Sequence, residues 1–191
     1  DLTNISQGRD LDNIRRGNEF LSWEEEYPGI DFAPFSGKRE YLDAEDKASC
    51  YFENEIDAFQ KAGSTQKKSR GSYFIHHPRG IKMWVGNVSM KEWGNTYDIE
   101  TGEVCINMEP VLAQYNGSWE RAIKYHEEVN TLHKKLSKDD PEKNNFLCFM
   151  KGLLPNNYVK FLGVYRDNWE ESRRRGIFVR ERIHTKWKIT E

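Results

Sequence analysis

Cysteine is scarce in this sequence, and long apolar runs are missing. The three cysteines, Cys50, Cys105 and Cys148, are far apart, and no CxxC pair occurs. This spacing excludes a zinc ribbon, argues against a disulfide framework and fits a reducing compartment, so we expect a cytoplasmic protein. No run of 18 apolar residues occurs and no secretory leader is visible, so we expect no membrane partner.

The common catalytic motifs are also missing. The sequence has no HExxH, glycine-rich phosphate loop, GxSxG or HNH-type cysteine pair. His126 and His133 are seven residues apart rather than four, so they do not form the zinc pair of a metallohydrolase. Glu45 and Lys47 have the E-x-K spacing of some nucleases, with Asp31 upstream, and such carboxylates could hold Mg²⁺. We expect no metal and no cofactor, and a metal-dependent nuclease is the alternative.

The sequence does contain enough apolar and aromatic surface for a core. Of its 191 residues, 37% are hydrophobic and 13% are aromatic, which suits one domain or one domain with an appendage. Residues 1–60 hold 15 acids and 6 bases, whereas residues 151–191 hold 5 acids and 10 bases. A basic end on a chain whose net charge is −2 indicates a side that faces a polyanion.

Periodicity divides the chain into two regions. Residues 1–62 form a helical N-terminal region, with helical spacing in part of 1–27 and again over 43–62. Residues 63–191 form a β-rich region, which we expect to bind nucleic acid. The two regions together predict an α+β fold with N-terminal helices.

Within the β-rich region, two candidate hairpins turn at Pro78–Gly80 and at Glu100–Gly102. One long helix is expected over 118–136, with Ser118 as its N-cap. A buried strand follows over 144–154. These elements predict a mixed or antiparallel sheet around one long helix, with closure into a small β-barrel as an option.

The C-terminal stretch, residues 158–189, contains the clearest functional pattern. Two strand-like runs flank a polar connection that contains Arg173, Arg174 and Arg175 and ends at Gly176. Side chains of the second run alternate between two faces. One face is mainly apolar and the other is mainly cationic, the latter with Phe178, Arg180, Arg182, His184, Lys186 and Lys188. A cationic face with a triple-arginine tip would suit phosphate groups, whereas the alternative is a solvated amphipathic hairpin.

Two further groups of residues extend the nucleic-acid hypothesis. Cations that could contact phosphate follow the helical region, namely Lys67, Lys68, Arg70 and Arg79. An aromatic and amide group that could stack on a base and read its edge consists of Trp84, Asn87, Trp93 and Tyr97. The alternatives are a merely solvated loop and a packing role, in which Trp84 and Tyr97 are core residues and Trp93 alone is exposed.

The runs YVKFLGVYR, WEESRRR and GIFVRERI resemble strand pairs of the PUA-like DNA-reading domains of modification-dependent restriction systems, the SRA and EVE group. The resemblance is confined to the C-terminal hairpin. It implies a small PUA-like β-barrel that grips DNA and flips a modified base into an aromatic pocket. It further implies Trp84, Trp93 and Tyr97 as pocket residues and the triple arginine as a phosphate contact.

We therefore expect a nucleic-acid-binding module with no catalytic activity of its own. DNA is the expected partner, RNA is the second choice, and a fused or associated nuclease would supply catalysis. The third interpretation is a protein-interaction domain, in which charge pairing inside the fold hides the basic face. Steep loss of affinity with rising salt is the signature that separates nucleic-acid binding from the other two functions.

Overall fold

The fold is seen in a computed structural model that describes residues 39–47, 49–65, 77, 79–90, 92–127, 136–137, 139–154 and 157–190. The helix expected within residues 1–27 lies outside these ranges, as does the cationic loop that contains Lys67, Lys68 and Arg70.

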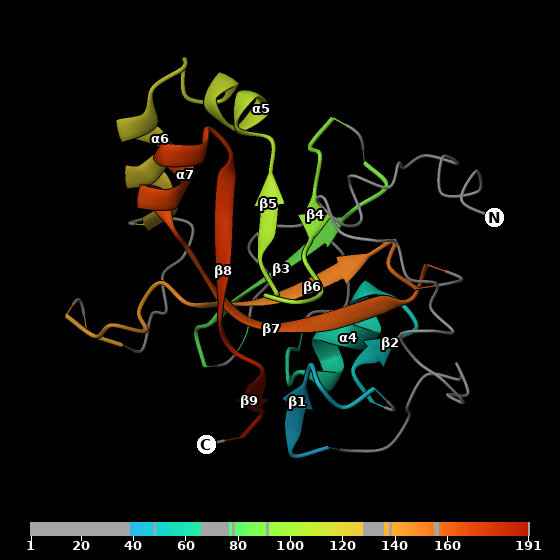
Figure 1. The fold of residues 1–191 in the computed structure, drawn as a ribbon. Coiled ribbons are helices and arrows are strands. Elements are labelled where there is room, and N and C mark those ends of the chain that lie inside the picture. Colours follow the sequence, from blue (N-terminus) through green and yellow to red (C-terminus); the bar gives the residue numbers. More distant parts are fainter. Residues whose placement is uncertain are drawn as a thin grey trace.

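A seven-stranded mixed sheet forms the centre of the fold (Figure 1). Its strands are β2 (Tyr51–Phe52), β3 (Lys82–Asn87), β4 (Thr96–Tyr97), β5 (Val104–Ile106), β6 (Phe146–Lys151), β7 (Val159–Asp167) and β8 (Phe178–His184). Six of them follow the order β3, β6, β7, β8, β5, β4, and β2 pairs with β7. The β3–β6 pair is parallel and the other pairs are antiparallel. The predicted α+β fold with a mixed sheet is confirmed.

The sheet is open, so the barrel option is wrong. Among the described strands, β3 and β4 lie at the two ends of the order and do not pair with each other. A separate two-stranded sheet consists of β1 (Tyr41–Asp43) and β9 (Lys186–Lys188), with Leu42 opposite Trp187. It lies at the bottom of Figure 1, beyond the end of β8.

Four short helices complete the described part of the chain. They are α4 (Glu55–Lys61), α5 (Met108–Ala113), α6 (Trp119–Tyr125) and α7 (Trp169–Arg175). The side chains of Asn54, Ser118 and Asn168 cap α4, α6 and α7 by accepting a hydrogen bond from a backbone N–H three residues on. Ser118 is thus confirmed as an N-cap, while residues 128–135 of the predicted long helix lie outside the described ranges.

The predicted helix over 43–62 is correct only in its second half. Tyr51 and Phe52 form β2 instead, opposite Lys160 and Val159 of β7. Both aromatic side chains are buried by this strand pairing. Helix propensity is a weak preference that tertiary contacts override, so helical spacing of apolar residues was insufficient to predict the structure of residues 51–52.

The hairpin at Glu100–Gly102 is confirmed, since β4 and β5 pair antiparallel around it. Gly102 has a φ of 77°, which explains a glycine at that turn. The strand predicted over 144–154 is β6. The other predicted hairpin is not described on its first side, and its second strand, β3, pairs with β6.

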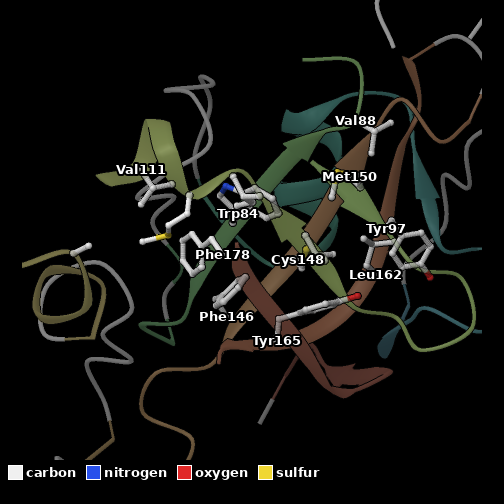
Figure 2. Packing of buried hydrophobic residues seen from close by; sticks show 14 residues of the cluster. Trp84, Val88, Tyr97, Val111, Phe146, Cys148, Met150, Leu162, Tyr165 and Phe178 are labelled. Carbon is white, nitrogen blue, oxygen red and sulfur yellow. The ribbon is translucent and has the colours of Figure 1, made fainter. Parts of the chain in front are cut away.

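Two hydrophobic cores lie on opposite faces of the sheet. The first contains Trp84, Phe146 and Phe178 together with residues of α5 and α6, and Trp169 of α7 packs against it (Figure 2). The second contains Phe59 of α4, residues of β1 and β9, and alternate residues of β3, β6 and β7. Side chains of one strand therefore alternate between two interiors, which is why β6 reads as a continuous apolar run.

The C-terminal stretch differs from the predicted hairpin in two ways. The connection between its strands is the helix α7, which ends at Gly176 with a φ of 68°. The second run is two strands in different sheets, β8 and β9. The expected cationic face is also wrong at its start, because Phe178 and Arg180 point into the first core and are fully buried.

Candidate functional site

A buried charged pair lies at the centre of the helix-covered face. Arg180 of β8 is directly opposite Asp167 of β7 in the strand register, and its Nε lies 2.9 Å from Asp167 Oδ1. The two side chains are 0% and 6% exposed. Asp167 is a carboxylate that cancels the charge of Arg180, which makes burial of the guanidinium tolerable.

Three aromatic rings surround the Arg180 guanidinium. Its Cζ lies 4.5 Å from the ring of Trp84, 4.7 Å from that of Phe146 and 4.6 Å from that of Phe178. A planar cation is attracted to the negative face of an aromatic ring, and the attraction strengthens when water is excluded. We call these five residues, Arg180, Asp167, Trp84, Phe146 and Phe178, the arginine cage.

Two further titratable side chains are buried beside the arginine cage. Burial, and then the charge of Arg180, lower the pKa of Lys82 to about 7. Burial, followed by the charges of Arg180 and Lys82, lowers the pKa of His126 to about 3, so His126 is neutral at neutral pH. Burial raises the pKa of Asp167, against the opposing effect of Arg180. These mutual effects place the four ionisable groups in one electrostatic neighbourhood.

His126 is packed among aromatic rings as well. Its ring centroid lies 5.2 Å from that of Phe178 and 5.7 Å from that of Trp169. Its side chain is only 2% exposed, so His126 is a residue of the core. The arginine cage is therefore bordered by a buried, neutral histidine.

The predicted triple-arginine tip is the last turn of α7, and each arginine pairs with an acid. Arg173 Nη2 lies 3.3 Å from Glu120 Oε1, Arg174 Nη2 2.6 Å from Glu171 Oε2, and Arg175 Nη1 2.8 Å from Glu103 Oε1. Cations are also favoured in this turn because of the helix dipole. The three arginines thus form ion pairs inside the fold, with acids that lie outside the acidic N-terminal region.

The remaining predicted phosphate contacts are scattered. Arg79 donates to the carbonyl of Lys188 and stacks on Trp187, 4.5 Å from the ring centroid. Arg182 donates to the carbonyl of Leu162. Lys186 is exposed in β9 and lies 3.8 Å from Asp43. The described cations therefore do not form the single face predicted for them.

Three residues of the predicted base pocket, Trp84, Trp93 and Tyr97, belong to or pack against the first core. Trp84 and Tyr97 are 3% and 5% exposed in the first core, and Trp93 packs against that core. Asn87 accepts hydrogen bonds from the backbone and hydroxyl of Ser89. Trp84 and Tyr97 are thus core residues, as the packing alternative predicted.

Sequence reasoning missed a polar and aromatic surface on α6. Arg121 and Lys124 are exposed, and neither forms an ion pair with another described residue. Tyr125 is 37% exposed, and its ring centroid lies 5.5 Å from that of Tyr115. The available signal was the i, i+3 and i+4 spacing of Arg121, Lys124 and Tyr125, which places them on one side of a helix.

The residues of the nuclease alternative are only partly described. Glu45 and Lys47 are exposed in the turn that follows β1, and Asp31 lies outside the described ranges. Within the part of the chain that is described, no three His, Cys, Asp or Glu side chains gather as metal ligands would. Nor does any helix there have both the length and the apolar character needed to cross a membrane.

Comparison of the sequence with models of known protein families gives no match, and comparison with curated protein sequences gives none. The resemblance to PUA-like domains therefore rests on the residues of β7, α7 and β8 alone and stays a prediction.

Proposed function

We propose that this chain is a nucleic-acid-binding domain that contacts its ligand through α6 and α7. One observation supports this proposal, the mixture of exposed cations and partly exposed aromatic rings on these two helices. The cations are Arg121, Lys124, Arg173 and Arg174, and the aromatic side chains are Trp119 and Tyr125 of α6, with Tyr115 of the turn before α6 beside Tyr125. Cationic surfaces interleaved with stacking platforms are typical of proteins that bind single-stranded or unpaired nucleotides.

Arg173 joins the two helices into one surface. It pairs with Glu120 of α6, and its Cζ lies 5.4 Å from the ring of Trp119. Figure 1 shows α6 and α7 side by side at one end of the sheet. Cations from both helices are therefore within reach of one polyanion.

The ion pairs of Arg173 and Arg174 are compatible with binding to phosphate. The side chains of both arginines are about half exposed or more, at 48% and 67%. Exposed ion pairs contribute roughly 0–1 kcal/mol, so a phosphate can replace the carboxylate at little cost. Arg175 is more deeply placed, and we assign its pair with Glu103 to the fold.

DNA is the proposed ligand, on the basis of the resemblance in β7, α7 and β8. That resemblance extends the proposal to a modified base and to a restriction system in which another domain or protein cuts. Trp84 and Tyr97 are buried, so a base would stack on the partly exposed rings of α6 rather than on them.

The test is fluorescence anisotropy with plain duplex DNA, methylated duplex DNA, single-stranded DNA and RNA at two salt concentrations. The variant is Arg121→Gln/Lys124→Gln, and the matched control is Lys61→Gln/Lys188→Gln, which removes the same charge from α4 and β9. We expect salt-sensitive binding, and the variant should flatten the slope of log K against log salt by about 2.

Two results would contradict the proposal. One is the absence of salt-sensitive binding to all four ligands, which would leave a protein partner as the better candidate. The other is equal loss of binding in the variant and the control, which would move the contact surface away from α6. Cleavage that requires Mg²⁺ would support the nuclease alternative instead.

A further inference from the structure

The Arg180 guanidinium has donors that lack acceptors among the described residues. Asp167 Oδ1 lies 2.9 Å from Nε as an ion pair without hydrogen-bond geometry, and Nη1 and Nη2 also have no hydrogen-bond partner among the described residues, although all these atoms are buried. A guanidinium carries five N–H donors, and a buried donor without an acceptor costs about 1–3 kcal/mol, or more when it is charged. The protein therefore retains an unfavourable arrangement at the centre of its first core.

A second buried donor lies at the same place. The indole Nε1 of Trp169 is buried and has no acceptor among the described residues. Trp169 stacks on Phe178 with ring centroids 4.7 Å apart, and Phe178 is one of the three rings around Arg180. Arg180 and Trp169, which both contact the Phe178 ring, thus carry buried donors that lack acceptors among the described residues.

The electrostatic surroundings favour a negatively charged acceptor. Lys82 is 5% exposed on the same face of the sheet and lies close enough to Arg180 for their charges to oppose each other. His126, the other titratable neighbour, is neutral at neutral pH. Asp167 is the carboxylate that forms an ion pair with Arg180, with Nε 2.9 Å from Oδ1.

We propose that the Nη1 and Nη2 edge of Arg180 binds one small oxyanion inside the arginine cage. An oxyanion with two oxygens, such as phosphate or a carboxylate, matches the guanidinium fork and accepts two parallel charge-assisted hydrogen bonds. Asp167 holds the guanidinium from its Nε side, and the three rings fix its plane. The site is separate from the exposed surface on α6 and α7, and binding there does not depend on nucleic acid.

A ligand would enter close to the surface. The side chains of Asp167 and Lys82 retain 6% and 5% exposure, so the polar edge of the cage lies just below solvent. Asn168 and Trp169, at the start of α7, are half-buried next to Asp167. Local opening of this helix end is the expected route, and slow exchange between free and bound protein should follow.

The test is a titration of the intact chain with inorganic phosphate, at constant ionic strength maintained with sodium chloride. Side-chain ¹H–¹⁵N resonances of Arg180 report on the guanidinium directly, and the midpoint of thermal unfolding reports on stability. We expect saturable changes in both with phosphate and none with chloride alone. A parallel titration with acetate tells a carboxylate ligand from a phosphate ligand.

Variants make the assignment specific. Arg180→Lys keeps the charge and removes the fork, so phosphate affinity should fall at least about tenfold, the equivalent of one lost charge-assisted hydrogen bond. The control, Arg166→Lys, alters an exposed arginine of β7 that lies outside the proposed nucleic-acid surface, and it should retain wild-type affinity. If Arg180→Lys does not fold, the response of the wild-type Arg180 resonances to phosphate still tests the proposal. Arg180 resonances that respond to neither phosphate nor acetate would overturn the proposal.

Discussion

Replacement of Arg180 by methionine is expected to destabilise the protein through the carboxylate that remains. Asp167 is buried, and burial already raises its pKa while Arg180 opposes that rise. Methionine fills much of the arginine volume among the three rings, so the main loss is the charge. Breaking a buried pair by removing one partner costs about 3–5 kcal/mol, and we expect a loss of this size at neutral pH.

This loss should shrink as the pH falls. Without Arg180 the folded-state pKa of Asp167 rises further above its value in the unfolded chain. A group whose pKa is raised by folding binds protons more tightly in the folded state, so its protonation stabilises the variant. The deficit of the variant relative to wild type is therefore largest at neutral pH and decreases as Asp167 takes up a proton.

The assay is urea unfolding followed by circular dichroism at neutral pH and at about pH 5. The double variant Arg180→Met/Asp167→Asn removes both charges and should recover most of the stability. Lys186→Met is the matched control, because its partner Asp43 is 3.8 Å away at the surface and the pair should contribute at most about 1 kcal/mol. An equal deficit at the two pH values, or no recovery in the double variant, would refute the reasoning.

Two other predictions concern buried positions. Folding lowers the pKa of Lys82 from 10.5 to about 7, so its charge costs stability in full below neutral pH and ceases to do so toward pH 10.5. Lys82→Met should therefore stabilise the protein by up to about 5 kcal/mol below neutral pH and by little in alkali, as measured by urea unfolding across pH. A stability difference that stays constant with pH would be inconsistent with a buried ammonium. Gly163→Ala should cost more than about 1 kcal/mol, because Gly163 has a φ of 131° and a Cβ there would lie 2.5 Å from the carbonyl oxygen of His184. Gly117→Ala, with a φ of 77° and no atom within 4 Å of the added Cβ, should cost less in the same thermal-unfolding assay, and equal losses would contradict this account.

Local patterns were sufficient for much of the sheet. The glycine turn between β4 and β5, the apolar run of β6 and the strand β7 each follow from residues that are close in sequence. The N-cap Ser118 could also be predicted from the sequence, because capping depends on a few adjacent residues. Elements whose stability is local were predicted from the sequence.

Elements that depend on distant partners were not. The helical spacing around Tyr51 and Phe52 gave no sign that β7 would bury them as a strand. Arg180 was predicted to lie on a cationic face that contacts phosphate, because strand alternation alone separates arginine from its apolar neighbours in sequence. Only the register of β7 and β8, which places Asp167 opposite Arg180, shows that this face is the interior. The sequence contained both residues but not their pairing.

The parallel pairing of β3 with β6 has a consequence for how the chain folds. Residues 88–145, which include β4, β5, α5 and α6, lie between the two strands. Closing a long loop costs chain entropy before any contact repays it, and such non-local pairing slows folding. In the described sheet β3 pairs with β6 alone, so during synthesis its apolar residues Met83, Trp84 and Val85 must wait until β6 has emerged. In that interval β3 is an unpaired edge that a second chain can bind, which makes this strand the expected starting point of misassembly.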